Sequence, residues 1–170
     1  MAGNVKLDQI DLKILRLLQD DGRMTNVELA SRVGISAPPC LRRVRALEAA
    51  GLIGGYHAAL DGKGLGFAVE VFAMVGLDSQ HEDDLARFEA AMNTHPIVRE
   101  CYMLNGEVDF ILKCVARDLE EFQTFLTSKL TPAPHVASVK TSFVIRQAKG
   151  APGYPTELLS AAVDAPVQGD

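Results

Sequence analysis

The sequence holds few of the residues that build disulfide frameworks or metal sites. Its cysteines, Cys40, Cys101 and Cys114, are odd in number and form no Cys-x-x-Cys pair, which argues against a disulfide framework and against a structural zinc site. The four histidines also lack the HxxxH and HExxH spacings that place two metal ligands on one helix face. We therefore expect reduced, apolar cysteine side chains, no metal and no cofactor.

Long hydrophobic segments are absent as well. No apolar run approaches the roughly 20 residues that cross a bilayer, and residues 1–6 lack the apolar stretch of a signal peptide. Nevertheless, 48% of the residues are hydrophobic and 23% are charged, which is typical of a folded globular protein. We expect a cytoplasmic protein that does not bind membranes, with one ordinary domain or two small ones.

The net charge of −5 is unevenly distributed along the chain. Residues 1–60 hold eight lysines and arginines against six acidic residues, whereas residues 61–170 hold nine against sixteen. Three of the basic residues, Arg42, Arg43 and Arg45, lie within a stretch of four. A small basic module on an acidic body fits a nucleic-acid-binding regulator whose second half has another task.

The first half of the chain has the pattern of a helix-turn-helix. Apolar residues recur at helical spacing over residues 7–19. A second helix is expected over residues 26–33, because Thr25 and Glu28 form a capping-box pattern. Gly34 then ends this helix in a tight turn.

Ser36 is a suitable cap for a third helix, in which Leu41, Val44 and Leu47 are expected to face inward. Residues 52–60 are predicted to form a short strand pair or wing that turns at the two adjacent glycines. Residues 61–66 contain three glycines and are the expected linker. Residues 1–60 are thus predicted to be a winged helix-turn-helix domain.

The second half alternates between strand and helix patterns, which predicts an α+β fold for the chain. Asn105-Gly106 marks a hairpin turn between the second and third strands. The order βαββαβ predicts a ferredoxin-like domain over residues 67–150, with both helices on one face of an antiparallel sheet and the other face open to dimerisation. Residues 151–170 are expected to be extended or mobile. The expected strands are 67–77, 98–104, 108–115 and 136–147, and the helices are 82–94 and 118–130.

The third helix carries the candidate DNA contacts. Small residues near its start allow close approach to base edges, and the arginines further on can reach phosphates or guanine. The alternative is a solvated face on which Arg43 or Arg45 pairs with Glu48 or with an aspartate of the first helix. The candidate DNA-binding residues are Ser36, Pro38, Pro39, Arg42, Arg43 and Arg45.

The hairpin allows two interpretations. In the structural one, Asn105-Gly106 only makes the turn and Asp109 is merely exposed. In the functional one, the hairpin N–H groups and Asp109 bind the carboxylate and the amine of an amino acid. Strand alternation places Thr141 and Ser142 on opposite faces of the sheet, and one hydroxyl could line a pocket, although such pairs are common in strands.

At these residues the sequence resembles the Lrp/AsnC family, the leucine-responsive or feast/famine regulators, over about residues 1–150. The resemblance is carried by LDQIDLKILRLLQDDGRMTNVELASRVGISAPPCLRRVRALEAAGLIGGYHAALD, by CYMLNGEVDFILKCVARDLEEF and by VASVKTSFVIRQAK. It implies a winged helix-turn-helix joined to a ferredoxin-like domain that forms dimers, which often assemble into octamers. It also implies that amino acids bind between dimers and alter assembly or DNA binding.

The resemblance further implies positions for the effector site. The family's glycine-x-x-aspartate hairpin corresponds to Gly106 and Asp109, and its recognition helix to residues 36–45. The implied effector-binding residues are Tyr102, Met103, Leu104, Gly106, Asp109, Thr141 and Ser142.

We therefore predict a sequence-specific transcription regulator that binds double-stranded DNA and whose assembly or DNA affinity responds to a small amino acid. An enzyme is not expected, because no nucleophile–base pair, metal ligand set or phosphate loop is recognisable. A third alternative is an assembly module whose helix-turn-helix makes protein contacts, but the basic run at residues 42–45 argues against it.

Overall fold

The structure is a computed structural model that describes residues 6–151 and 153–159. The chain forms two compact units: one combines the residues up to Ala59 with those from Lys149 onward, and the other is Leu60–Ala148. Each unit has its own hydrophobic core. The second unit is thus inserted into the first along the chain.

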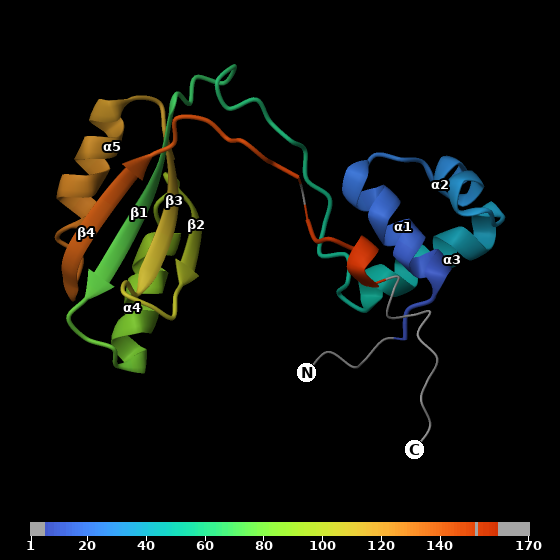
Figure 1. Cartoon of the computed structure of the whole chain (residues 1–170), viewed down its shortest axis with the longest axis horizontal. Helices are drawn as coiled ribbons and strands as arrows, with labels where there is room; N and C mark the ends of the chain where they lie inside the picture. The colour runs from blue at the N-terminus through green and yellow to red at the C-terminus, as the bar shows by residue number, and fades with distance from the viewer. Residues whose placement is uncertain (1–5, 152, 160–170) are drawn as a thin grey trace. The chain divides into compact units, whose positions relative to one another are not determined.

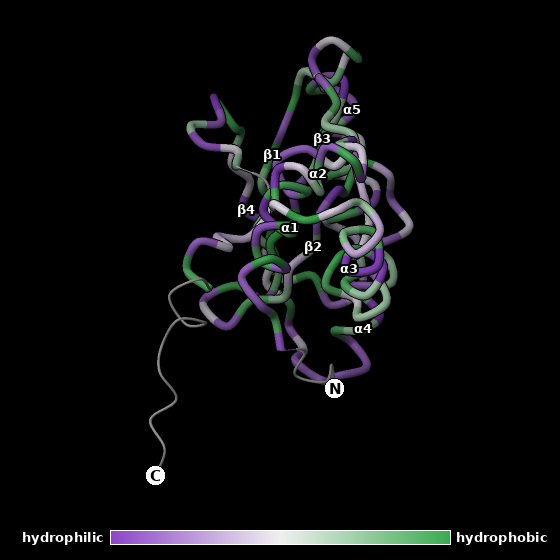
Figure 2. Tube along the Cα trace, turned by 90° about the vertical axis from the view of Figure 1, so that its right-hand side faces the viewer, coloured by the Kyte–Doolittle hydropathy of each residue, from purple (hydrophilic) through white to green (hydrophobic). Residues whose placement is uncertain are grey.

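Three helices form the core of the first unit: α1 (Gln9–Asp20), α2 (Asn26–Val33) and α3 (Ala37–Ala49). Polar and apolar residues alternate along these helices (Figure 2), and the apolar stripes meet in a common core. Its buried members are Ile14, Leu29, Ala30, Val33, Cys40 and Leu47.

The turn between α2 and α3 forms as its sequence predicts. At the start of α2, Thr25 Oγ1 accepts a hydrogen bond from Glu28 N at 3.2 Å, which is one half of the predicted capping box, while the Glu28 carboxylate pairs with Arg32. Gly34 has φ +84° and ends this helix in the left-handed conformation, which costs glycine less than any other residue. Because Ile35 N then donates to Ala30 O at 3.0 Å, α3 begins at a fixed angle to α2.

The predicted strand pair over residues 52–60 does not form. None of these residues is in a strand. Gly55 has φ +158°, so its backbone is extended and does not make the tight left-handed turn that a two-residue hairpin needs. The segment instead runs in an irregular path from the end of α3.

The second unit is an antiparallel sheet covered on one face by helices (Figure 1). Its strands are β1 (Val69–Leu77), β2 (Val98–Met103), β3 (Phe110–Ala116) and β4 (Val136–Phe143), in the order β2-β3-β1-β4. The helices are α4 (Glu82–Asn93) and α5 (Leu119–Phe125), which continues as the π-helical η1 (Leu126–Leu130). This is the predicted ferredoxin-like arrangement.

One face of the sheet packs against the helices and the other is left open. Alternate residues of β1 and β3 form the buried core with side chains of the helices, including Val71, Ala73, Phe110, Leu112, Phe88 and Phe122. On the opposite face, Phe72, Met74, Ile111 and Val115 are only partly buried. The isolated chain therefore leaves an apolar strip uncovered.

The hairpin between β2 and β3 is longer than the predicted two-residue turn. β2 ends at Met103 and β3 begins at Phe110, and the loop is closed by Leu104 N donating to Asp109 O at 2.8 Å. Asn105-Gly106 lies inside this wider loop. The loop widens because the Asp109 side chain and backbone N–H both bond to β1 instead of pairing within the hairpin.

Part of the C-terminal segment is ordered against the first unit, where an extended or mobile tail is expected from the sequence. The backbone of Tyr154 hydrogen-bonds with Gln19 of α1, and Thr156 is buried. Residues 152 and 160–170, also part of the predicted tail, lie outside the described residues. Among the helices described, none is long and apolar enough to cross a membrane.

Candidate DNA-contacting helix and effector cleft

The start of α3 is held to α2 while its outer face stays exposed. Asn26 Nδ2 at the start of α2 donates to Ala37 O at 2.8 Å. Ser36 precedes the helix in an extended conformation, but its side chain makes no capping hydrogen bond. Ser36 and Pro38 are exposed and Pro39 is partly buried, so the first turn of α3 presents small side chains outward.

The buried stripe of α3 differs by one residue from the prediction. Leu41, which was expected to face inward, is 38% exposed, whereas Cys40 is fully buried and packs with Leu47 in the core. Counting in helical steps, the buried Cys40 and Leu47 lie on one side of α3 with the partly buried Val44. Pro38, Arg42 and Arg45 lie on the opposite side. The exposed face therefore combines a small residue with two arginines.

The three arginines have different surroundings. Arg42 and Arg45 are exposed. Arg43 instead takes part in the alternative interaction that the sequence left open: its Nη1 lies 2.8 Å from Asp8 Oδ2 and 2.8 Å from Asp11 Oδ1. Arg43 thus joins the middle of α3 to the first turn of α1 through its Nη1.

The ion pairs of Arg43 shift the pKa values of Arg43 and Asp8. Hydrogen bonds to Asp11 and Asp8 raise the pKa of Arg43. For Asp8, burial alone would raise the pKa, but the backbone N–H of Asp11 and the Arg43 guanidinium outweigh it and lower the pKa below 3.8. The carboxylate of Asp8 is therefore stabilised in the folded state.

The Arg43→Ala variant is expected to unfold about 1–2 kcal/mol more easily than the wild type at neutral pH, because it leaves Asp11, a half-buried carboxylate, without its partner. The Asp8 contribution exists above pH 3.8 and is lost as the pH falls through the lowered folded-state pKa. The difference between wild type and variant should therefore shrink below about pH 4. Urea unfolding at several pH values measures it, and a gap that is independent of pH would contradict the assignment.

In the second unit, Asp109 joins the β2–β3 loop to the end of β1. Its Oδ2 accepts a hydrogen bond from Leu77 N at 2.7 Å, and its Oδ1 accepts one from Gln80 Nε2 at 3.1 Å. Its own N–H donates to Val75 O at 3.0 Å. The Asp109 side chain therefore anchors the loop to β1. The structural interpretation of the sequence, in which Asp109 is merely exposed, does not describe it.

A small cleft of about 250 Å³ opens beside this anchor. Predicted effector residues from the end of β2, the loop and Asp109 lie together around it. Polar groups of Gln80, Asn105 and Asp109 face apolar ones of Leu85, Met103 and Leu104, which suits a small molecule with charged and aliphatic parts. The lining residues are Gln80, Leu85, Met103, Leu104, Asn105, Gly106 and Asp109.

The other predicted effector residues lie elsewhere in the chain. Tyr102 is 52% exposed on the open face, and its hydroxyl donates to Glu100 Oε2 at 2.7 Å. Thr141 and Ser142 lie on β4, which β1 separates from the hairpin strands. They pair with Ala73 and Phe72, which confirms that they face opposite sides of the sheet. Within one chain these residues do not join the cleft.

Thr141 instead borders a second cleft, of about 550 Å³, on the helical face. This cleft is mainly apolar and lies between α5 and the sheet edge. Its lining is Val69, Leu119, Phe122, Gln123, Leu126, Thr141 and Phe143.

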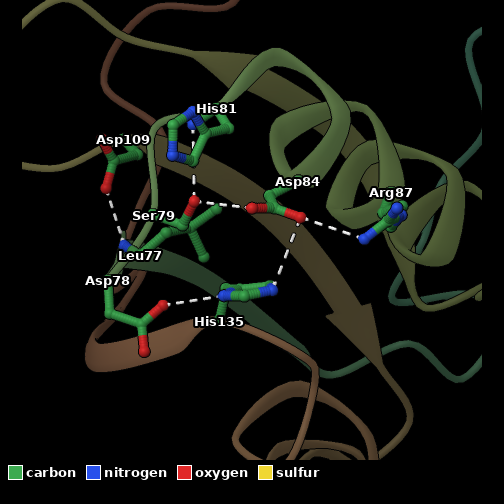
Figure 3. Close-up of polar contacts among 8 residues, drawn as sticks. All are labelled: Leu77, Asp78, Ser79, His81, Asp84, Arg87, Asp109 and His135. Carbon is green, nitrogen blue, oxygen red and sulfur yellow. Dashed lines mark hydrogen bonds and ion pairs between the residues drawn. The ribbon is translucent and has the colours of Figure 1, made fainter.

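The segment that carries Gln80 is fixed by a polar network (Figure 3). Ser79 Oγ donates to Asp84 Oδ2 at 2.6 Å. His135 Nδ1 lies 2.9 Å from Asp78 Oδ1, and its Nε2 lies 3.5 Å from Asp84 Oδ1. The hydrogen bond from the Ser79 hydroxyl, followed by the electrostatic influence of His135 and Arg87, lowers the pKa of Asp84 against the effect of burial. One wall of the cleft is thus held by the start of α4 and by the residue before β4.

The sequence analysis missed Gln80, Leu85 and Asn105 as cleft residues. Asn105 was noticed only for its turn, and the other two become neighbours of the hairpin through the sheet topology. No group of three or more possible metal-ligating side chains gathers within residues 6–151 and 153–159.

Comparisons with known proteins match both units. Residues 7–53 match a winged helix-turn-helix DNA-binding family, and residues 70–154 match the Lrp/AsnC ligand binding domain. A leucine-responsive regulatory protein of Rhizobium meliloti is 55% identical over 151 residues, which are 89% of this chain and 97% of that protein. The Bkd operon transcriptional regulator of Pseudomonas aeruginosa is 47% identical over 83% of this chain and 92% of its own.

Solved structures agree with these matches. A transcriptional regulator from Neisseria meningitidis, crystallised as a complex with L-Met, has a TM-score of 0.86 and 35% identity, covering 91% of this chain and 99% of its own. An AsnC family transcriptional regulator from Agrobacterium tumefaciens has a TM-score of 0.84 and 31% identity, covering 90% of this chain and 99% of its own.

Proposed function

Because the chain belongs to the Lrp/AsnC family of DNA-binding transcription regulators, we propose that it binds DNA through the outer face of α3 and an amino acid in the hairpin cleft. The relatives are transcription regulators and not enzymes. DNA binding is assigned to residues 1–60 and effector binding to residues 67–150, and the protein acts in the cytoplasm.

The DNA contacts are assigned to the exposed residues of α3. Ser36, Pro38 and Pro39 form its small first turn, which allows close approach to the major groove. Arg42 and Arg45 are exposed further along the helix and reach phosphates or guanine. Arg43 acts indirectly, because its ion pairs with α1 hold α3 in position.

The observation that carries the effector assignment is the cleft of about 250 Å³ beside Asp109. Its size suits one small amino acid. Carboxylate and amide oxygens of Asp109 and Asn105 can receive an ammonium group, loop N–H groups can hold a carboxylate, and Leu85 and Met103 can contact an aliphatic side chain.

The open face of the sheet is assigned to dimerisation. Phe72, Met74, Ile111 and Val115 form its apolar strip, and Lys113 lies among them within 3.2 Å of Glu70 and 3.6 Å of Glu100. Such a strip is a self-complementary surface once two copies meet about a twofold axis.

Dimers then assemble into an octamer, in which Tyr102, Thr141 and Ser142 of neighbouring copies complete the cleft.

A thermal-shift panel with the common amino acids at millimolar concentration tests the effector assignment. L-leucine and L-methionine come first, because one relative is named leucine-responsive and one solved relative holds L-Met. A ligand at about 100 times its dissociation constant adds about 2.7 kcal/mol to the stability of the folded state. No shift with any amino acid would contradict the assignment. Analytical ultracentrifugation with and without the active amino acid then reports the assembly.

A further inference from the structure

Residues 153–159 return to the helix-turn-helix unit and bind α1 through a specific contact. The side-chain amide of Gln19 pairs with both backbone polar groups of Tyr154. Its Nε2 donates to Tyr154 O at 2.8 Å, and Tyr154 N donates to its Oε1 at 2.9 Å. Two hydrogen bonds to a single residue fix the register of the segment on the helix.

The conformation of the segment depends on this contact. Gly153 has φ +69°, in the left-handed region that disfavours other residues. A Cβ at this position would also overlap the side-chain amide of Gln19. Three residues further on, Thr156 is only 7% exposed, and its hydroxyl is without a hydrogen-bond partner among the described residues. The segment is therefore packed into the unit and does not lie loosely over it.

The segment also borders the residues that follow α3. It lines an apolar cleft of about 710 Å³ together with α1 and residues 52–57, including Leu15, Leu18, Ile53 and Tyr56. The Tyr56 hydroxyl donates to Glu48 Oε1 at 2.9 Å. Glu48 lies in the last turn of α3, so the cleft that the C-terminal segment borders also contains a side chain that is hydrogen-bonded to the DNA-contacting helix.

The path of the chain through the sheet explains how the C-terminal segment returns to α1. β1 and β4 are antiparallel neighbours, and Val144 N beyond β4 donates to Glu70 O at 2.9 Å. The chain thus enters and leaves the sheet at neighbouring points. Residues 153–159, which follow the sheet in the chain, thus dock within the unit whose helices precede the sheet.

We propose that residues 153–159 are a brace of the DNA-binding unit: their docking on α1 through Gln19 holds the end of α3 in its DNA-binding position. This goes beyond the proposed function, in which only α3 and the hairpin cleft act. The family match that covers the DNA-binding unit ends at residue 53.

The test compares full-length protein with the Gly153→Ala and Gln19→Ala variants, using a DNA fragment that the wild type selects from a random pool. Leu158→Ala is the matched control, because Leu158 belongs to the same segment but is 72% exposed. Both test variants should bind the fragment about tenfold more weakly at fixed salt, as expected for the loss of one or two hydrogen bonds. The control should bind as the wild type does. Equal affinity in all four proteins would overturn the proposal.

Hydrogen exchange tests the docking without DNA. In Gly153→Ala, backbone amides of α1 and residues 52–57 should exchange faster than in the wild type, while those of β1 and β3 keep their rates. Unchanged exchange in α1 would overturn the brace. Because this measurement needs neither DNA nor an amino acid, it separates a failure of the brace from a failure of the proposed function.

Discussion

Replacing Arg42 and Arg45 together with alanine is expected to remove most of the DNA affinity and to leave the stability of the protein unchanged. Both side chains are exposed, and neither takes part in an ion pair within the described residues. If each reaches a phosphate or a guanine, its loss costs about 1–3 kcal/mol of binding. The double variant should therefore bind about 100-fold more weakly, with a salt slope reduced by about two.

Fluorescence anisotropy with a selected DNA fragment, repeated over a series of salt concentrations, measures both quantities. Arg117→Ala is the matched control, since it removes an exposed arginine from the effector unit, where Arg117 pairs with Glu121. Arg43→Ala provides the contrast, because its weaker DNA binding should be accompanied by lower stability. A double variant with the wild-type salt slope would show that this face of α3 does not contact the DNA backbone.

These arginines also illustrate how far the sequence determines the first unit. The helix boundaries follow from local signals such as the Thr25 cap and the left-handed Gly34, which act within a few residues. Which side of α3 is buried depends on packing instead. Cys40 and Leu41 are adjacent and both apolar, so periodicity alone could not decide between them, and contact with α1 and α2 buries Cys40.

Contacts between distant residues explain the remaining differences. The Arg43–Asp11 pair joins residues that are 32 positions apart in the sequence. From the sequence, this ion pair was only one of several possible interactions of Arg43. The order of strands and helices in the effector unit could be predicted, because each element has its own periodicity. The cleft could be predicted only in part, because Gln80 joins the hairpin through the pairing of β1 with β3. The same sheet order keeps Thr141 and Ser142 away from it.

The second large effect is expected at Asp109, where Asp109→Ala should abolish the stabilisation by an amino acid and also destabilise the unit. The alanine leaves the partly buried N–H of Leu77 without an acceptor, which costs about 1–3 kcal/mol. It also releases Gln80, which holds the other carboxylate oxygen. Loss of the effector response in this variant alone would therefore not distinguish a ligand contact from a collapsed loop.

Asp109→Asn separates the two roles. The amide oxygen can still accept from Leu77 N–H, and Gln80 can rotate its own amide to accept from the new NH₂ group, so the loop should keep nearly wild-type stability. The negative charge that attracts the ligand's ammonium group is lost, however, and charged hydrogen bonds contribute about 1.5–3 kcal/mol. The amino-acid affinity should fall by about 10- to 100-fold in titrations followed by thermal shift or calorimetry.

Glu107→Gln is the matched control for Asp109→Asn, because it removes one negative charge from the same loop. Glu107 is highly exposed, and its carboxylate lies 3.3 Å from Lys140 Nζ on the surface, outside the cleft lining. If only the Asp109 variant loses affinity, the effect comes from a contact with the ligand and not from the overall charge of the loop. If Asp109→Asn instead keeps the full response, the carboxylate serves only to hold the loop against β1, and the ammonium group must be bound by other residues of the assembly.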